Sequence, residues 1–224
     1  MNFKIIANFV SLTLIVTHQL AAQSDTSSAA ADPDQPVRET APLPAGWTAR
    51  PDAGGDVNNI KFVTMEPGFH LTLGPATILY RKEDQTNGPF HTLATFHQMK
   101  KLKHSEGYGL FLGGQQLEGP AQAYTYFLVR GDGKFTIKRR QGEKVTAVTS
   151  GWQSHPAIKQ ADAKGAATNL LEIDAKVDPQ RVSFRANGRE VYSIPAGRIP
   201  TRGMVGLRVN HNLDLHVEGF AVHQ

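Results

Sequence analysis

The chain has 224 residues, of which 40% are hydrophobic, and its formal net charge is +4. It has no cysteine, which excludes a disulfide framework and leaves the burial of apolar side chains as the source of stability. The charge excess is too small for the basic footprint of a nucleic-acid-binding protein, so we expect no nucleic-acid partner.

The first 22 residues have the pattern of a secretory signal peptide. Lys4 precedes an apolar stretch at residues 5–16, and Leu20-Ala21-Ala22 offers a small-residue cleavage site. The apolar stretch is shorter than the roughly 20 residues that span a bilayer, although an uncleaved N-terminal anchor is the alternative. We therefore expect an exported protein, periplasmic or extracellular, without a stable membrane anchor after cleavage.

Residues 23–45 are rich in Ser, Ala, Asp and Pro and have almost no large apolar side chains. A segment of this composition cannot bury enough surface to offset its chain entropy. We predict a disordered tether at 23–45 and a folded domain at 46–224.

Short alternating runs, typical of β-strands, follow one another along the rest of the chain. The expected strands before residue 150 are 60–65, 69–73, 76–81, 90–99, 107–112, 124–130, 134–140 and 145–149. Four or five more lie between residues 168 and 222, where Asn187-Gly188 predicts a two-residue type I′ hairpin. Evenly spaced strands without helical periodicity predict an all-β fold, a two-sheet antiparallel β-sandwich.

The apolar members of the alternating runs are expected to form the buried core, and the alternation does not assign every one of them to a face. This predicted core comprises Ile78, Leu93, Phe96, Phe111, Phe127, Val129, Ile137, Leu171, Ile173, Val182, Phe184, Leu207, Val209, Leu215, Val217 and Phe220.

The strand and turn residues after position 168 resemble the concanavalin A-like lectin/glucanase superfamily. The resemblance lies in Asn169-Leu170-Leu171-Glu172-Ile173, Arg181-Val182-Ser183-Phe184, the hairpin Asn187-Gly188-Arg189-Glu190-Val191 and Gly203-Met204-Val205-Gly206-Leu207-Arg208-Val209. The arrangement is similar to laminin-G-like modules and to the 3-keto-disaccharide hydrolase domain. It implies a concanavalin A-like jelly roll over roughly residues 60–222 and supports a fold more than an activity.

One catalytic motif of that superfamily begins in this chain and is not completed. Family 16 glycoside hydrolases carry Glu-x-Asp-x-Glu or Glu-x-Asp-x-x-Glu, and Glu172 and Asp174 match its first two carboxylates. The third would fall at Lys176 or Val177, neither of which can act as a carboxylic acid. We therefore expect no such hydrolysis, a polar outer strand face at Glu172 and Asp174, and an ion pair from Lys176 to one of them.

The last expected strand contains residue types that can bind a metal. Asp214, His216 and Glu218 alternate along it, and His211 lies just before it. Two imidazoles and a carboxylate could hold a divalent metal, but the same pattern is typical of a strand with one solvent-facing side, which we favour. Asp132 offers calcium one carboxylate where about 6 to 8 oxygen ligands are needed. We predict no metal and no cofactor.

Aromatic residues and one arginine form the candidate ligand site. Tyr124 and Tyr126 alternate on one strand with Arg130 farther along the same face, Tyr108 lies on the preceding strand, and Trp152 lies in a loop. Such rings offer an apolar face and a polar tip, which suits a sugar, and an arginine can donate paired hydrogen bonds to oxygens. The alternative is ordinary core packing.

Three functions remain open on these residues. The favoured one is an exported module that binds a carbohydrate or another extracellular polymer and is not a conventional glycosidase. The alternative is a hydrolase acting on a modified sugar such as a 3-keto-glycoside, with Glu106, Glu118, His97 and Asp132 as candidate acids and bases. A second alternative is an interaction or structural module of the cell envelope.

Overall fold

A computed structural model describes residues 33–37, 39 and 41–224 of the chain. Within it, Asp34–Gln224 forms one compact unit. The predicted signal peptide at 1–22 and residues 23–32 of the predicted tether lie outside the described residues. In the described part of the chain, no helix has the length and hydropathy needed to cross a membrane.

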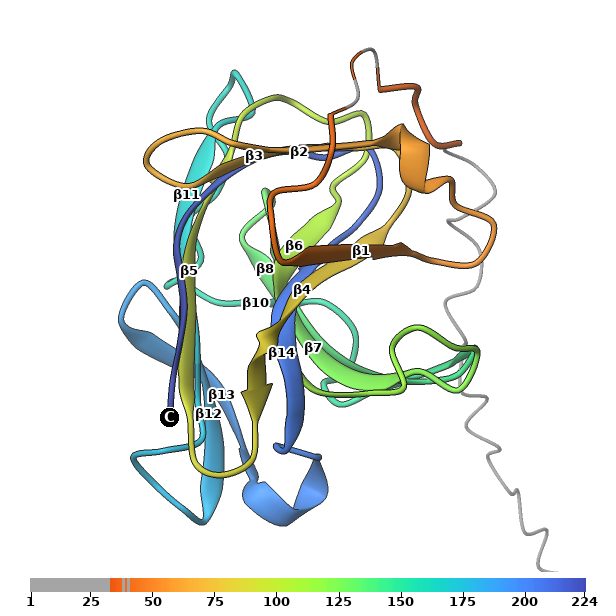
Figure 1. The fold of residues 1–224 in the computed structure, drawn as a ribbon. Helices are drawn as coiled ribbons and strands as arrows, with labels where there is room; N and C mark the ends of the chain where they lie inside the picture. The colour runs from red at the N-terminus through yellow and green to blue at the C-terminus, as the bar shows by residue number, and fades with distance from the viewer. Residues whose placement is uncertain (1–32, 38, 40) are drawn as a thin grey trace, which may run out of the picture. The chain divides into compact units, whose positions relative to one another are not determined.

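Two antiparallel sheets pack face to face in this unit (Figure 1). The eight-stranded sheet has the order β1-β4-β14-β6-β7-β8-β10, and β9 pairs with β8. Its strands are β1 (Trp47–Pro51), β4 (Thr77–Thr86), β6 (Gly107–Gln115), β7 (Ala123–Arg130), β8 (Lys134–Gln141), β9 (Lys144–Ala147), β10 (Gln153–Ser154) and β14 (Gly203–Val209).

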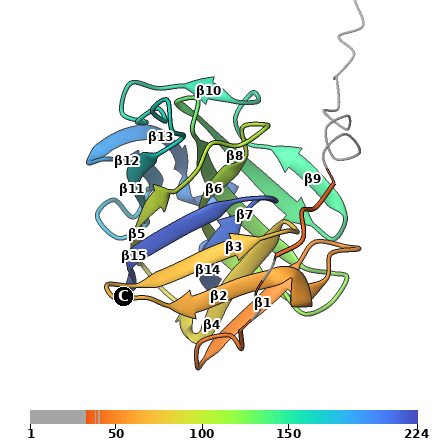
Figure 2. The ribbon, with the colours of Figure 1, turned by 90° about the horizontal axis from the view of Figure 1, so that it is seen from above.

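The seven-stranded sheet has the order β13-β12-β11-β5-β15-β3-β2. Its strands are β2 (Ile60–Thr64), β3 (Phe69–Leu73), β5 (His91–Gln98), β11 (Ala167–Asp174), β12 (Arg181–Ala186), β13 (Arg189–Pro195) and β15 (Asp214–His223). Figure 2 shows β5, β15 and β3 side by side, as their pairing requires. The helices in the described residues are the short η1 (Val57–Asn59) and η2 (Ala196–Arg198). The predicted two-sheet antiparallel β-sandwich is confirmed.

Strand β5 illustrates how the pleat separates core from surface. Ala94 and Phe96 are fully buried between the sheets, whereas Leu93 and His97 are partly exposed. Because successive side chains point to opposite faces, Leu93 shares the outer face with His97. The prediction that Leu93 belongs to the core is therefore wrong.

The main core fills the space between the sheets with side chains from both. Phe127 on β7 and Phe184 on β12 are fully buried, and their ring centroids lie 5.6 Å apart. Phe220 is only partly buried at the edge of this core, because a register shift interrupts β15 between Glu218 and Ala221. Apart from Leu93, Phe220, Ile78 and Phe111, every residue predicted for the core is buried in it.

The hairpin between β12 and β13 has the predicted turn. Ala186 pairs with Arg189, and the two residues between them have positive φ angles, 50° for Asn187 and 76° for Gly188. Positive φ at both central positions defines the type I′ turn, so the prediction is confirmed. The Asn187 side chain also ties the hairpin to β11, because its Oδ1 accepts a hydrogen bond from the Leu170 N–H at 3.0 Å.

The segment before β1 is held against the sandwich in the described residues. The Gln35 N–H donates to Asn212 Oδ1 at 2.7 Å, and the Val37 N–H donates to Asn59 Oδ1 at 2.6 Å. Leu43 packs against the main core. The compact unit thus includes the chain from Asp34 onward, twelve positions before the expected domain start at Gly46.

Candidate functional site

A second apolar cluster lies on the outer face of the eight-stranded sheet. Along β7, Phe127 and Val129 point into the main core, so the alternating Tyr124, Tyr126 and Leu128 point to the opposite face. The outer-face cluster consists of Ile78, Tyr80, Phe111, Leu117, Tyr124, Tyr126 and Leu128, with Trp152 and Met204 packed against it.

Two residues predicted for the core belong to this cluster. Ile78 and Phe111 are buried as expected, but they lie in the outer-face cluster and not between the sheets. Segments beyond the strands cover them, since Leu117 from the loop after β6 belongs to the same cluster. An apolar sheet face that is covered at one end and open beside it is suited to a ligand site.

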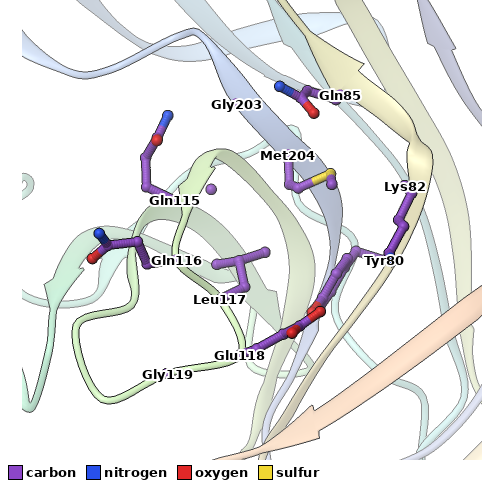
Figure 3. Close-up of a pocket in the computed structure, with 11 residues that line it drawn as sticks. Tyr80, Lys82, Gln85, Gln115, Gln116, Leu117, Glu118, Gly119, Gly203 and Met204 are labelled. Atoms are coloured by element: carbon purple, nitrogen blue, oxygen red, sulfur yellow. The ribbon is translucent and has the colours of Figure 1, made fainter.

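A pocket of about 360 Å³ opens on this face, between β4, β14 and the loop that follows β6 (Figure 3). Figure 3 shows Tyr80 and Lys82 on one side, Met204 on a second, and the loop from Gln116 to Gly119 on a third. The lining residues are Tyr80, Lys82, Gln85, Gly114, Gln115, Gln116, Leu117, Glu118, Gly119, Gly203 and Met204. Amides, one cation, one carboxylate and an apolar floor therefore surround one space.

Tyr80 contributes a buried hydroxyl group to the pocket. The residue is 3% exposed, and its hydroxyl is buried without a hydrogen-bond partner among the described residues. Burial raises the pKa of this phenol, and the nearby Glu118 carboxylate raises it further. A buried hydroxyl without a partner costs free energy, so a ligand oxygen in the pocket would find a neutral donor that is already desolvated.

Beside the pocket, arginine side chains converge on one aspartate. Arg208 on β14 donates from Nη1 to Asp52 Oδ1 and from Nη2 to Asp52 Oδ2, both at 2.8 Å. Arg140 on β8 donates to the same Oδ2 at 3.1 Å. Burial acts to raise the pKa of Asp52, but the guanidinium groups of Arg208, Arg140 and Arg50 outweigh it and hold this pKa below its usual value.

The structure places four of the five predicted ligand-binding residues on this outer face. Tyr124 and Tyr126 are 2% and 6% exposed, and burial raises the pKa of Tyr126 to about 12. Arg130 stacks over the Trp152 ring at 4.4 Å and donates two hydrogen bonds to Asp132. These four residues support the sheet face, whereas other residues line the pocket.

Tyr108, the fifth predicted residue, lies in the main core. It is fully buried, packs on Phe96 with ring centroids 5.4 Å apart, and accepts a hydrogen bond from Asn169 Nδ2 at 3.2 Å. Burial raises its pKa to about 12. In this position the Tyr108 ring has no exposed surface to offer a ligand.

Of the four candidate acids and bases, only Glu118 lines the pocket. Glu106 is bonded to His211 at 3.0 Å. His97 lies on the outer face of the seven-stranded sheet, where its Nδ1 is 2.9 Å from Thr168 Oγ1. Asp132 pairs with Arg130 and Lys134 in the turn between β7 and β8. The structure therefore does not bring these groups together.

The residues of the candidate metal site make separate polar contacts. Asp214 is 3.1 Å from His70, whereas His216 and Glu218 are 3.3 Å apart, and His211 faces Glu106. Among the residues that the structure describes, no group of three or more His, Asp or Glu side chains is arranged to hold a metal ion.

The incomplete glycosidase motif lies away from the pocket, on the seven-stranded sheet. Glu172 bonds His91 at 3.0 Å, and Asp174 Oδ1 accepts hydrogen bonds from the backbone N–H groups of Lys176 and Val177. The expected ion pair of Lys176 with Glu172 or Asp174 is wrong. Its Nζ donates instead to the Gln224 carbonyl at 2.9 Å, because the turn after β11 points this side chain toward the C-terminus.

Sequence reasoning did not find Tyr80, Lys82, Asp52 or Arg208. One signal was present, because Arg208 lies between Leu207 and Val209 in an apolar run. A charge there must point away from the core and be paired. Asp52 is 156 positions away in the sequence, so the pairing itself had no local signal.

The sequence matches no family model and no curated protein, but the fold is similar to solved structures. The carbohydrate binding module CBM66 from Bacillus subtilis has a TM-score of 0.57 at 10% identity, covering 80% of this chain and 96% of that one. A protein of unknown function with a galectin-like fold from Bacillus subtilis has 0.55 at 13%, covering 80% and 89%. The Bacillus licheniformis β-glucanase has 0.52 at 10%, covering 81% and 92%.

These neighbours define the class of fold. The chain is a concanavalin A-like, galectin-type jelly roll, as the strand and turn residues after position 168 predicted. At identities this low the likeness shows the fold alone, and any function has to be argued from the site.

Proposed function

We propose that this chain is an exported carbohydrate-binding module, without conventional glycosidase activity, whose saccharide site is the pocket on the outer face of the eight-stranded sheet. The observation that carries the proposal is the composition of that pocket, in which an apolar floor lies among amides and a desolvated phenol. Two structural neighbours, a carbohydrate binding module and a β-glucanase, support it by analogy of fold.

The lining matches the chemistry of a sugar. Each sugar hydroxyl both donates and accepts, and so does the amide of Gln85, Gln115 or Gln116. Leu117 and Met204 offer apolar contact to the C–H faces of a ring. A volume of about 360 Å³ lies within the usual range of small-molecule pockets, about 300–1,000 Å³.

The absence of conventional glycosidase activity is proposed from the carboxylates. Hydrolysis with retention uses two carboxyl groups about 5 to 5.5 Å apart, and inversion uses two at about 6.5 to 9.5 Å. Glu118 is the one carboxylate among the lining residues. Glu172 and Asp174 belong to the other sheet and are occupied by His91 and by a turn.

Tyr80→Phe tests the site, because it removes one oxygen from the pocket. That hydroxyl has no partner in the described residues, so the variant should keep its melting temperature. Its affinity for a saccharide selected from a glycan array should fall about tenfold, the cost of one lost hydrogen bond. Tyr192→Phe on β13, in the other sheet, is the matched control. Failure of the wild-type protein to bind any saccharide would refute the proposed function.

A hydrolase acting on a modified sugar is the second candidate, and one observation favours it. Glu118, named from the sequence as a candidate acid or base, lines the same pocket as the Tyr80 phenol. Incubation with a 3-keto-disaccharide tests this reading. Product that appears with the wild-type protein and not with Glu118→Gln would establish it, and no product from the wild-type protein would remove it.

A further inference from the structure

Beside the pocket, arginine side chains outnumber the carboxylates with which they pair. Arg50, Arg140 and Arg208 all act on Asp52, and this one carboxylate accepts the paired bonds from Arg208 and a single bond from Arg140. Two positive charges therefore remain without a neutralising partner inside this cluster. A charge that is partly removed from water attracts an opposite charge more strongly than one in bulk solvent.

The hydrogen-bond donors on this face point to the same conclusion. Arg50 Nη1, Arg140 Nε and Arg208 Nε are buried and lack a hydrogen-bond partner among the described residues, as does the Tyr80 hydroxyl. The corresponding acceptor nearby is Gln122 Oε1. Because the three unpaired guanidinium N–H groups outnumber this acceptor, the face favours a group that is rich in acceptors. Carboxylates and sulfates have acceptors only.

The register of the strands connects these cations to the pocket. Arg50 on β1 pairs with Ile78 on β4, and Ile78, Tyr80 and Lys82 follow one another on the same side of β4. The Tyr80 phenol therefore lies between Arg50 and Lys82. Arg50 also donates from Nη2 to the carbonyl of Gly119, a lining residue, at 3.2 Å.

Glu118 is the negative charge that opposes these cations. Its side chain is exposed at the rim, where solvent and salt screen it. Arg140 and Arg208 are far more buried, with side chains 14% and 5% exposed, so their field is screened less. At the Tyr80 phenol itself Glu118 acts more strongly than Arg50, so the excess of positive charge lies with the buried arginine side chains beside the pocket.

From this balance we infer that the saccharide bound by the pocket is acidic, with a carboxylate or sulfate group seated beside Tyr80 between Arg50 and Lys82. This inference rests on the proposed function and narrows its ligand to anionic glycans such as uronates or sulfated polysaccharides. The same cations would make the affinity fall as ionic strength rises, because the interaction is partly exposed.

Binding is measured by calorimetry with paired polymers that differ only in charge. Polygalacturonate is compared with its fully methyl-esterified form, and dextran sulfate with dextran. At low salt the charged member of at least one pair should bind about tenfold or more tightly, as charge-assisted hydrogen bonds provide. Preference in the first pair identifies a carboxylate ligand and preference in the second a sulfate.

Arg50→Gln locates the effect, because it removes a cation whose Nη1 has no partner among the described residues. It should lower affinity for the charged polymer about tenfold and lower affinity for its uncharged counterpart less. Arg50→Lys should retain part of the preference. Lys61→Gln, which removes an equal charge on β2 of the other sheet, is the matched control, and melting temperatures verify folding of all three variants.

The outcomes separate the two proposals. Equal binding of charged and uncharged polymers, with the Tyr80→Phe effect intact, overturns the acidic ligand and leaves the carbohydrate-binding function standing. Equal losses in Arg50→Gln and Lys61→Gln also overturn it, because the attraction would then be diffuse. The acidic-saccharide proposal is also overturned if DNA or anionic phospholipid vesicles bind equally tightly and this binding depends on Arg50. If neither polymer pair nor the glycan array binds, the proposed function itself is wrong.

Discussion

At the scale of single residues, Asp52 is the counterion of a buried guanidinium group. It accepts both hydrogen bonds of the Arg208 guanidinium, whose side chain is 5% exposed. Asp52→Asn would leave that charge buried without a counterion, and we expect a loss of about 3–5 kcal/mol in the free energy of unfolding. Urea denaturation at pH 7 measures it. Glu143→Gln, at an exposed turn between β8 and β9, is the control and should change little.

The same carboxyl predicts a pH dependence. Its pKa is lowered in the folded protein, so it stabilises the fold above the ordinary aspartate pKa of about 3.9. That contribution is lost as the pH falls through the lower, folded value. Between about pH 4 and pH 2 the wild-type melting temperature should therefore decline more steeply than that of Asp52→Asn. Parallel curves for the two proteins would contradict this role of Asp52.

Gly188 provides a test of backbone conformation alone. Its φ is 76°, and a Cβ added there would meet no heavy atom within 4 Å. Gly188→Ala should therefore cost about 1–2 kcal/mol through left-handed backbone strain and not through a clash. Gly197→Ala in η2 also has open space around the added Cβ, but its φ is not positive. A melting temperature lowered equally in both variants would show that φ is not the cause.

At the scale of elements, one ring from β7 and one from β12 pack against each other between the two sheets. Phe127 and Phe184 are fully buried, with ring centroids 5.6 Å apart in an edge-to-face arrangement. Each change to alanine should cost about 3–5 kcal/mol. The double variant should lose less than the sum, because neighbouring residues share the interaction. Strictly additive losses in chemical denaturation would mean that the two rings do not couple.

The outer faces of the two sheets differ in what they present. On the seven-stranded sheet, histidines and carboxylates pair across strands, as with His91 and Glu172 or His70 and Asp214. On the eight-stranded sheet, apolar rings and arginines meet around a pocket. The candidate catalytic and binding residues are therefore not gathered on one face, and the pocket with Leu117 and Met204 in its lining lies on the eight-stranded sheet.

At the scale of the whole molecule, we expect no hydrolysis of ordinary β-glucans, even though a β-glucanase shares the fold. Lys176 and Val177 occupy the positions where a third carboxylate would be needed, and Glu172 is bonded to His91. Incubation with laminarin, lichenan and agarose should release no reducing ends. Turnover that Glu172→Gln abolishes would contradict this expectation and place the active site on the seven-stranded sheet.

Local pattern determined much of the fold of this protein. Alternating runs and turn residues were sufficient for most of the strands, for the two-sheet sandwich and for the Asn187-Gly188 turn, because each depends on neighbours in the sequence. Strands β1 (Trp47–Pro51) and β10 (Gln153–Ser154) were not predicted. The same alternation assigned Phe127 and Phe184 to the core. It could not tell which face of β4 and β6 would be the inner one, since Ile78 and Phe111 are buried on the outer face by a loop.

The candidate site was decided by tertiary structure. Tyr124 and Tyr126 could be recognised as lying on one face of a strand. Whether that face was open depended on the segments that carry Asp52 and Leu117, which fold over it. Tyr80 and Lys82 became pocket residues because β14 and the loop after β6 lie beside β4. The alternation of apolar and polar residues indicates which side chains share a face of a strand. A pocket or a buried ion pair forms only where segments that are distant in the sequence meet. The local pattern of a single sequence does not contain that information.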